Sequence, residues 1–352
     1  MRVVVVGATG NVGSALVRAL SEDPDVASVL GLARRTPDWE VERTSWAAVD
    51  LRDEEAEERL TEHFAGADAV VHLAWMIQPA RDPVTTWATN VLGTERVLRA
   101  VTAAGVGTLV YASSVGAYTP GPKDRAVAED WPTHGWPEAP YTREKSYVER
   151  MLDAFEPRHP DVRVVRMRPG FIFAREAAAH QRRLFLGPLV SGPMVRPELS
   201  PVVPDVRGLR FQVVHAADAA EAYRLALFRD VRGAFNLAAE PVVDAALLAG
   251  LFRARVRRLP RRLLRGAMAG AWRARLTAAP PQLFDALVRL PVMDCSRAAS
   301  DLGWQPRHTA EEALLDLVYG LRHGIGMNTP PLAARLPHGR RDELTTGVGR
   351  RP

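Results

Sequence analysis

A tyrosine and a lysine stand four residues apart in the stretch PYTREKSYVER, residues 140–150. Because this segment is of helical type, we expect Tyr141 and Lys145 on one face of a helix. A phenol has a pKa of about 10 and a neighbouring ammonium favours the phenolate, so the pair can act as a general acid or base. By itself such a spacing is often a coincidence of a helix surface. Lysine is so rare here, with Lys123 and Lys145 among 46 basic residues, that coincidence becomes less credible.

Other residues of these types have weaker settings. Tyr147 is followed four places later by Met151, so it has no lysine partner on its helix face. Lys123 lies in the loop TPGPKDRA, and we expect its loss to matter little.

Two serines follow the strand-like run TLVYAS in VYASSVGAY. A hydroxyl at this point could polarise a substrate oxygen, although serines that end a strand are often only caps of the next loop. Alternation along a strand sends Ser113 and Ser114 to opposite sides. We therefore expect at most one of them to point at the substrate.

A glycine-rich turn opens the chain in VVVVGATGNVGSALVRAL. Glycine accepts positive φ and lets the backbone approach a pyrophosphate, whose charge a helix N-terminus favours. In this strand-turn-helix context, the turn predicts dinucleotide binding rather than a tight turn without ligand. The turn residues expected at the cofactor are Gly7, Thr9, Gly10, Asn11, Val12 and Gly13.

The end of the second predicted strand, GLARRTP, should meet the adenosine ribose. A carboxylate there would bind the 2′-hydroxyl, whereas arginine accommodates a 2′-phosphate. Arg34 and Arg35 therefore favour NADP(H), with NAD(H) as second choice, although both could belong to the general excess of arginine. Asp50 and Leu51, after a third strand, are candidates for holding the adenine.

Short apolar runs alternate with helical segments through the first half of the chain. The alternation predicts an α/β fold of Rossmann type, a doubly wound parallel sheet with binding at the strands' carboxyl ends. The strand-like runs are 3–6, 28–33, 69–74, 108–113 and 162–167, and the helical segments are 11–22, 54–64, 84–104 and 141–155.

After about residue 170 the pattern loosens, which predicts a smaller, discontinuous substrate lobe. The segment 211–228 reads as strand, turn and helix, 246–292 as helical and basic, and 309–322 as an amphipathic helix. We assign 1–174 and about 211–245 to an NADP-binding domain, about 175–210 and 246–332 to the lobe, and 333–352 to a flexible tail.

Composition narrows the function classes. Cys295 is the one cysteine, which excludes an internal disulfide and a cysteine-built zinc site; we expect a small buried hydrophobe, and no metal. The net charge of +5 comes from scattered arginines, so we expect no nucleic-acid partner.

The segment 252–276 holds nine arginines and reads as amphipathic helices broken near Pro260, with membrane or anionic-substrate contact as alternatives. No membrane span or leader is evident, which favours a soluble cytoplasmic protein.

The motifs VGATGNVG, HLAW, NVLGTERVL, VYASSVGAY, PYTREK and RMRPG occur in this order within residues 1–245. In this the chain resembles the extended short-chain dehydrogenase/reductases, which include nucleotide-sugar epimerases and dihydroflavonol-type reductases. A weaker similarity lies in DCSRAASDLGWQP at 294–306. The resemblance implies that Tyr141 transfers the proton, that Lys145 assists it and holds a ribose, and that Ser114 polarises the carbonyl.

The resemblance also implies further positions. Backbone contacts to the cofactor would come from the strand end His72 to Ala74, so that His72 need do no chemistry. Asn90 would lie near the site, although a helix-capping role is at least as plausible, and Asp218 is interpreted as a helix cap beside His215. A homodimer would form through the helices at 84–104 and 141–155. The added cofactor contacts are Leu73, Ala74, Asn90, Pro169 and Gly170.

Departures from the family pattern reduce the number of reactions that we expect this chain to catalyse. Val115 and Gly116 stand where sugar-nucleotide dehydratases have an acidic pair, which disfavours dehydration, and Tyr118 is not followed by the glycine of the epimerase motif. We therefore expect an NADP(H)-dependent oxidoreductase that reduces a ketone or aldehyde, or runs in reverse.

Two other functions remain open. A nucleotide-sugar epimerase with tightly bound NAD would use lobe arginines such as Arg253 or Arg257 to hold a diphosphate. A non-catalytic NADP-sensing protein is disfavoured by the presence of both Tyr141 and Lys145.

Overall fold

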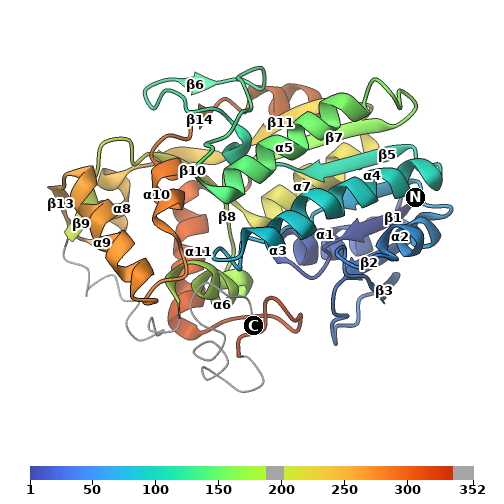
Figure 1. Ribbon diagram of the computed structural model, residues 1–352, viewed down its shortest axis with the longest axis horizontal. Helices are drawn as coiled ribbons and strands as arrows, with labels where there is room; N and C mark the ends of the chain where they lie inside the picture. Colours follow the sequence, from blue (N-terminus) through green and yellow to red (C-terminus); the bar gives the residue numbers. More distant parts are fainter. Residues whose placement is uncertain (188–201, 336–352) are drawn as a thin grey trace.

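A seven-stranded parallel sheet forms the centre of the protein, with strand order β3-β2-β1-β4-β5-β7-β11 (Figure 1). The structure, a computed structural model, describes residues 1–187 and 202–335. The strands are β1 (Arg2–Val6), β2 (Ser28–Ala33), β3 (Thr44–Ala48), β4 (Ala69–His72), β5 (Thr108–Ala112), β7 (Arg163–Pro169) and β11 (Gly233–Leu237). The predicted Rossmann-type fold is therefore confirmed.

Helices cover both faces of this sheet, which explains why its strands are uninterrupted apolar runs. One face carries α1 (Asn11–Glu22) and α7 (Ala216–Phe228), and the other carries α2 (Ala56–Phe64), α4 (Gly93–Ala103) and α5 (Pro140–Phe155). A short helix α3 (Pro83–Trp87) and a π-helical turn η1 (Ala88–Leu92) lead into α4.

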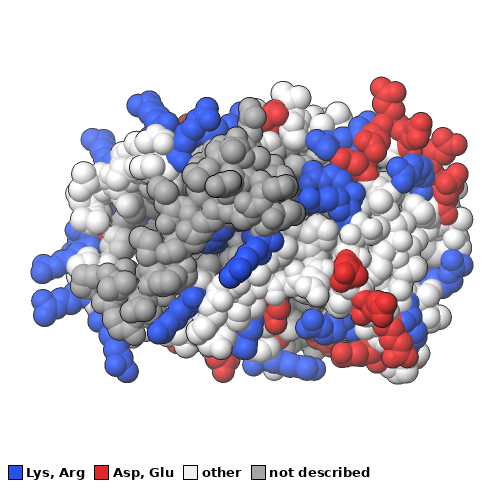
Figure 2. Space-filling model, turned by 90° about the horizontal axis from the view of Figure 1, so that it is seen from below, with Lys and Arg blue, Asp and Glu red and all other residues white. Residues whose placement is uncertain are grey.

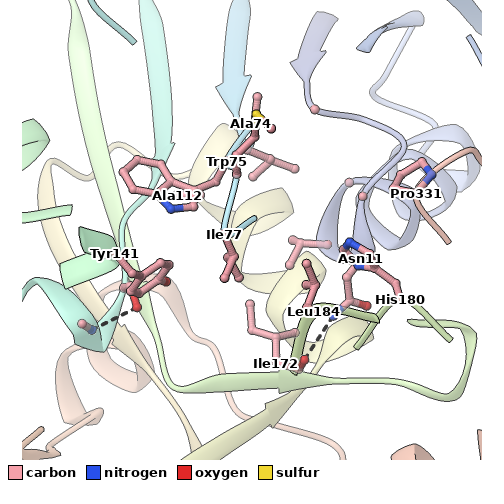
Figure 3. A pocket seen from close by; sticks show the side chains of 18 of the residues that line it. Asn11, Ala74, Trp75, Ile77, Ala112, Tyr141, Ile172, His180, Leu184 and Pro331 are labelled. Atoms are coloured by element: carbon pink, nitrogen blue, oxygen red, sulfur yellow. Dashed lines mark hydrogen bonds between the residues drawn. The ribbon is translucent and has the colours of Figure 1, made fainter. Parts of the chain in front are cut away.

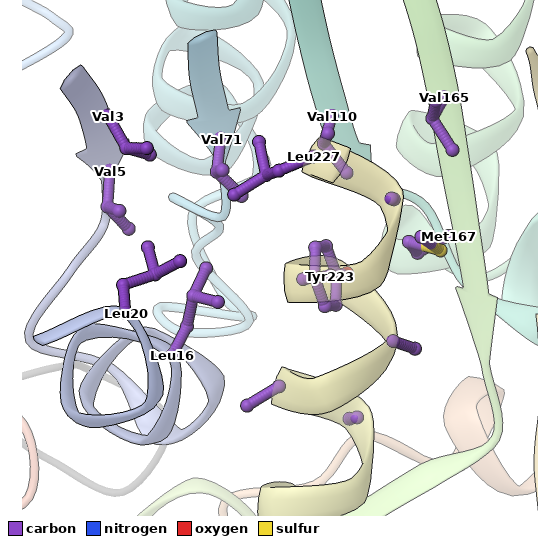
Figure 4. Close-up of a cluster of buried hydrophobic side chains, with 14 of the residues drawn as sticks. Val3, Val5, Leu16, Leu20, Val71, Val110, Val165, Met167, Tyr223 and Leu227 are labelled. Atoms are coloured by element: carbon purple, nitrogen blue, oxygen red, sulfur yellow. The ribbon is translucent and has the colours of Figure 1, made fainter. Parts of the chain in front are cut away.

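The alternation of β1 shows how the two cores are separated. Val3 and Val5 point to the first face, where they meet the cluster that holds Leu16 of α1 and Tyr223 of α7 (Figure 4). Val4 belongs to the cluster on the opposite face. Each strand thus buries apolar surface on both sides, which is the main stabilisation of such a sheet.

The remaining elements lie beyond the carboxyl ends of the strands (Figure 1), and we call them the second lobe. They include β8, β10 and β12, which fall in ranges that the sequence analysis assigned to the NADP-binding domain. Its small sheets join β8 (Phe171–Phe173), β10 (Phe211–His215) and β12 (Ala239–Val243), β9 (Val202–Asp205) and β13 (Arg255–Arg258), and β6 (Ala126–Val127) and β14 (Val292–Met293). Its longer helices are α8 (Ala245–Phe252), α9 (Arg261–Arg273), α10 (Pro281–Leu287) and α11 (Ala310–His323). Short helical pieces are η2 (Val115–Ala117), η3 (Arg175–Ala177), α6 (Ala178–Gln181), η4 (Arg182–Leu186) and η7 (Ala298–Leu302).

Two strands of the second half have no clear counterpart in the sequence pattern. The expectation of a wholly helical 246–292 is wrong, because β13 has the sequence RVRR and pairs with β9 while all four residues stay exposed. The strand β11, GAFNL, completes the large sheet although it begins with glycine and contains a buried asparagine. Residues 188–201 of the predicted lobe and 336–352 of the predicted tail lie outside the described residues.

A buried ion cluster fixes α5 to the sheet at the end where the site lies. The carboxylate of Glu149 has no exposed surface and accepts hydrogen bonds from Arg168 at 2.9 and 3.0 Å and from Arg166 at 2.9 Å. Burial alone raises the pKa of Glu149, but the hydrogen bond and charge of Arg168, with Arg166 and Ser113, outweigh it and bring the pKa to about 2. The carboxylate therefore stays ionised and holds three elements together.

We expect Glu149→Gln to lower the free energy of unfolding by about 3–5 kcal/mol, because it leaves the buried guanidinium group of Arg168 without its carboxylate partner, whereas Arg166 keeps Asp153 and Glu156. Urea unfolding followed by circular dichroism measures this difference. The matched control is Glu95→Gln, which removes an exposed ion pair to Arg99 and should cost under about 1 kcal/mol. Equal losses in the two variants would contradict a special role of the cluster.

The same pair of proteins tests the ionisation of Glu149. Its pKa is about 2 in the folded chain and about 4.3 in an unfolded chain. The stabilisation is therefore fully present above the unfolded pKa and is lost as the pH falls toward the folded one. The wild-type and Glu149→Gln stabilities should converge over this window, and a constant difference would contradict the assignment.

Candidate active site

A continuous cavity of about 520 Å³ runs along the carboxyl ends of the large sheet and into the second lobe. The wall contains every residue that the sequence predicts at the cofactor except His72 and Asn90. Figure 3 shows residues from the edge of the large sheet and from the second lobe around the same space, with Tyr141 and Trp75 on one side and Asn11 on the other. The topology thus brings the glycine turn and the tyrosine helix to one site.

The glycine turn fits a pyrophosphate. Gly7 has φ +90°, and a Cβ there would lie 2.5 Å from the backbone nitrogen of Ala74. A Cβ on Gly13 would collide with the carbonyl oxygen of Gly7. Gly10 precedes α1 without any side-chain cap, so the first amides of this helix remain available for an anion.

Two arginines lie at the far end of the cavity, where β2 ends. Arg34 and Arg35 both line the wall, and burial followed by the charge of Arg35 lowers the pKa of Arg34. Asp50 also lines the wall, but its carboxylate accepts hydrogen bonds from Arg52 at 2.6 and 3.0 Å. Two neighbouring cations in a partly buried wall favour an anionic group between them.

Ser114 and Tyr141 lie side by side on the cavity wall. A hydrogen bond joins their side chains, and the Ser114 oxygen also accepts one from the backbone N–H of Gly116 at 3.0 Å. Ser113 turns the other way and donates to the carboxylate of Glu149 at 2.5 Å. The opposite directions predicted for the two serines are therefore observed.

The pKa of Tyr141 differs from the expectation. A neighbouring ammonium was expected to favour the phenolate, but burial raises the pKa and the hydrogen bond from Ser114 only partly opposes this rise. Tyr141 is therefore protonated at neutral pH in this structure, as a proton donor must be.

Lys145 is almost fully buried behind the tyrosine. Its Nζ donates to the carbonyl oxygen of Ala112 at 2.6 Å and lies 3.4 Å from the ring centroid of Trp75. Burial lowers its pKa well below the usual range, while Glu149 and Glu144 favour the charged form. Since an ammonium has three donors, this contact with Ala112 leaves capacity for a ribose hydroxyl.

Asn90 does not reach the cavity, which corrects its place among the cofactor residues. It is fully buried, its oxygen accepts from the Met76 amide at 2.7 Å, and its nitrogen donates to the Met76 carbonyl and to Glu144. It lies inside η1 and so is not a helix cap either. Its place in the structure is to fix the segment that follows β4, which carries Trp75 into the cavity.

Two further positions, His72 and Asp218, make structural contacts. His72 is buried with its Nε2 2.9 Å from Thr94, and burial, followed by the charge of Lys145, lowers its pKa to about 3, so it stays neutral. The interpretation of Asp218 as a helix cap is wrong, because His215 caps α7 by accepting from Ala217.

Lys123 has a more defined setting than its loop suggests. Its Nζ donates to the carbonyl oxygens of Arg210 at 2.6 Å and Leu287 at 3.0 Å, and burial lowers its pKa to about 7. It thus ties its loop to α10, whose other face lines the cavity. Both carbonyls lie more than 80 residues away in the chain, so no local pattern indicates these contacts, and the small effect expected from loss of Lys123 stays a prediction.

Several wall residues carry no sequence signal of their own. Thr329 donates to the carbonyl oxygen of Thr9 at 2.9 Å, so the segment after α11 lies over the glycine turn, and Tyr223 presents a buried hydroxyl without a hydrogen-bond partner. Only the tertiary fold joins residues 320 positions apart. Examples of wall residues to which the sequence analysis gave no role are Trp75, Met76, Ile77, His180, Gln181, Tyr223, Pro330 and Pro331.

Comparison with known proteins gives a family match and partial relatives. The sequence model of the NAD dependent epimerase/dehydratase family matches residues 3–238. The chain is 39% identical over 113 residues to L-arabinose 1-dehydrogenase (NAD(P)(+)) of Haloferax volcanii, which is 32% of this chain and 41% of that protein. It is 28% identical over 331 residues to an uncharacterized protein of Mycobacterium bovis, which is 93% of this chain and 31% of that protein. The matched regions span less than half the length of these relatives.

Solved structures share the fold. UDP-glucose 4-epimerase of Thermus thermophilus, solved with NAD, has a TM-score of 0.67 and 24% identity over 92% of this chain and 99% of its own. UDP-glucose-4-epimerase of Stenotrophomonas maltophila, solved with NAD and a formylated UDP-arabinopyranose, has a TM-score of 0.69 and 22% identity over 92% and 98%. Within the described residues, no helix combines the length and apolar character that crossing a membrane requires.

Gly116 offers a test of the site geometry, because a Cβ there would lie 2.8 Å from Cε1 of Tyr141. We expect Gly116→Ala to displace the tyrosine and to lower kcat on any carbonyl substrate about 100-fold, while cofactor affinity stays unchanged. Steady-state kinetics and fluorescence titration with NADPH measure the two quantities. Gly107→Ala, where a Cβ meets nothing within 4 Å, is the control, and an unaffected kcat in Gly116→Ala would contradict the close packing.

Proposed function

Because the chain belongs to the NAD dependent epimerase/dehydratase family, we propose that it is an NADP(H)-dependent oxidoreductase that reduces a ketone or aldehyde, or oxidises the alcohol in reverse. The observation that carries this proposal is the convergence of Ser114, Tyr141 and Lys145 on one cavity. The same cavity continues to two arginines where the adenosine ribose of a bound dinucleotide would lie.

Ser114, Tyr141 and Lys145 would each have a different role in a reduction. Bound NADP(H) would supply or accept the hydride. Ser114 would hydrogen-bond the substrate oxygen, which polarises the carbonyl, and Tyr141 would transfer its phenolic proton to that oxygen as the alcohol forms. Lys145, behind the phenol, would stabilise the phenolate that remains and hold the nicotinamide ribose.

The preference for NADP(H) rests on the end of β2. Arg34 and Arg35 line the cavity there, and Asp50, the one carboxylate near them on the wall, is paired with Arg52. A 2′-phosphate would bind these guanidinium groups by charge-assisted hydrogen bonds, whereas a 2′-hydroxyl would leave their charges without a partner anion.

We also propose that the chain forms a homodimer through the surface of α3, η1 and α5. Apolar side chains are exposed there, with Val84 at 76%, Tyr147 at 48% and Leu92 at 40% exposure. Tyr147 packs against Trp87 with ring centroids 4.8 Å apart. A second copy would cover this patch, in line with the tendency of such patches to mark interfaces.

The proton-transfer role of Tyr141 is tested by Tyr141→Phe. Turnover should fall by about 10²–10⁴-fold while the dissociation constant for NADPH stays within a factor of about two, because only the hydroxyl is lost. Because the pKa of Tyr141 is raised, the phenol stays protonated through neutral pH, and the rate of reduction should be constant there. The rate of reduction should decline at alkaline pH, where the phenol loses its proton, whereas the rate of alcohol oxidation should rise with pH. Stopped assays in both directions measure these profiles.

The outcome separates the rival functions. A variant as active as wild type would refute the role of Tyr141. Wild-type protein that retains NAD through purification, shown by absorbance, and interconverts UDP-sugars without net oxidation would be an epimerase. Tight NADPH binding without turnover on any carbonyl compound would indicate a sensor.

The cofactor preference is tested by Arg34→Ala. Its dissociation constant for NADPH should rise about 10–100-fold, which corresponds to the loss of a charge-assisted hydrogen bond, and that for NADH should stay unchanged. Fluorescence titration with both cofactors measures the change. The matched control is Arg18→Ala, on α1 outside the cavity wall, and an equal effect of Arg34→Ala on both cofactors would contradict recognition of a 2′-phosphate.

A further inference from the structure

The substrate half of the cavity is apolar. Beyond Ser114 and Tyr141, the second lobe closes the cavity with side chains from η4, α9 and α10 and with Leu290, which follows α10. These side chains are Leu184, Phe185, Met268, Leu283, Phe284, Leu287 and Leu290. From the opposite side, Met76 and Ile77 face them after β4, and Figure 3 shows Ile77 and Leu184 entering the same space.

Charged side chains on the wall of this cavity gather at its cofactor end. In the described part of the chain, the wall has charges at Arg34, Arg35, Asp50 and Lys145, all placed where the sequence predicts the dinucleotide. The imidazole of His180 is one further titratable group, and it lies near Asn11 of the glycine turn in Figure 3. The lobe side of the wall carries no Lys, Arg, Asp or Glu in either described range.

The arginines of the lobe are directed elsewhere. Arg261 and Arg265 bind the carboxylate of Asp285 at 2.8 and 2.6 Å, and Arg289 lies over the ring of Trp136 at 3.9 Å. Figure 2 shows basic side chains on the outer surface at the end that holds β13 and α9, whereas acidic ones gather at the opposite end. Asp285 thus holds two arginine side chains on one side of α10, while the leucines of this helix face the cavity.

The arginines that would hold a diphosphate in a nucleotide-sugar epimerase also lie outside the cavity wall. Arg253 ends α8 in a left-handed conformation and Arg257 lies in the fully exposed strand β13. Neither is part of the cavity wall. A diphosphate in this half of the cavity would therefore lie against leucine and phenylalanine side chains, which is strongly unfavourable for an unpaired charge.

From this wall we infer that the substrate is an apolar ketone or secondary alcohol, which places a hydrocarbon chain or ring system against the second lobe and carries no phosphate. The inference rests on the proposed oxidoreductase function and specifies its substrate. The oxygen at the reacting carbon would meet the hydroxyls of Ser114 and Tyr141, whereas the rest of the substrate would meet mainly leucine, phenylalanine and methionine side chains among the described residues. Sugar hydroxyls would lose their water hydrogen bonds against this wall without gaining partners.

Chain length provides the test. In the reduction of 2-butanone, 2-hexanone, 2-octanone and 2-decanone with NADPH, we expect kcat/KM of the full-length protein to rise about fourfold per added methylene until the wall is filled. L-arabinose with NADP⁺ and UDP-glucose are the polar comparisons, and their kcat/KM should fall far below that of 2-octanone. A kcat/KM that does not depend on ketone length, or that favours either polar compound, overturns the inference.

Substitutions in the cavity wall test which side chains cause the dependence of kcat/KM on ketone length. Leu283→Gln, a polar side chain of similar length on the cavity face of α10, should lower the ratio of kcat/KM for 2-octanone over 2-butanone about tenfold. The control Leu263→Gln changes a leucine of α9 that is 63% exposed and should leave this ratio unchanged. An equal ratio in both variants overturns the assignment of the wall.

A binding measurement separates this inference from the proposed function. Calorimetry with Tyr141→Phe saturated with NADPH records ketone affinity without turnover. Affinity that rises with chain length supports the apolar wall even where wild-type protein reduces none of the ketones, in which case the proposed function fails alone. Turnover of L-arabinose without any dependence of ketone affinity on length leaves the oxidoreductase standing and overturns the apolar substrate.

Discussion

The buried carboxylate of Glu149 is the interaction on which the site depends. It receives Ser113 from the end of β5, Arg166 and Arg168 from β7, and it belongs to the helix that carries Tyr141 and Lys145. A buried charge is tolerated only where it is paired and hydrogen-bonded, so the three elements cannot shift independently. The reactive hydroxyls are thus positioned by an ion cluster that never touches the cavity space itself.

The cluster extends toward the second lobe. Arg168 also donates to the hydroxyl of Tyr118 at 3.0 Å, and that hydroxyl donates to Asn236 of β11 at 2.7 Å. The nitrogen of Asn236 then donates to the carbonyl oxygen of Asp294 beside β14. A continuous chain of buried polar contacts therefore joins the helix of Tyr141 to the lobe that we propose as the substrate wall. A second buried carboxylate, that of Glu144, holds the opposite side through Asn90.

Local patterns in the sequence predicted the cofactor half of the site, and only the tertiary structure revealed the rest. Gly7 and Gly13 are set by the geometry of one turn, and strand alternation predicts that Ser113 and Ser114 point in opposite directions, so short segments suffice for these features. The choice of Ser114 over Ser113 rests on the family resemblance. The wall formed by α9 and α10 depends on which leucines face inward once Asp285 has bound two arginines, which no local period encodes. The contact of Thr329 with Thr9 and the role of Asn90 likewise join distant segments. The lowered pKa expected for Tyr141 was wrong because sequence spacing reports proximity to Lys145 but not the cost of burial.

The two lysines have one property in common: the Nζ of each is bound to main-chain carbonyl oxygens, Lys145 to Ala112 and Lys123 to Arg210 and Leu287. The remaining amine, the terminal nitrogen of Met1, donates to the carbonyl of Asp25 at 2.7 Å. That contact is exposed, whereas the side-chain cations other than the two lysines and histidine are guanidinium groups, which do not react with an amine-acylating reagent under the same conditions. Acylation of either lysine requires that its own hydrogen bonds open first. Chemical labelling of the two lysines consequently reports the rate of local opening at the tyrosine helix and at the lobe junction.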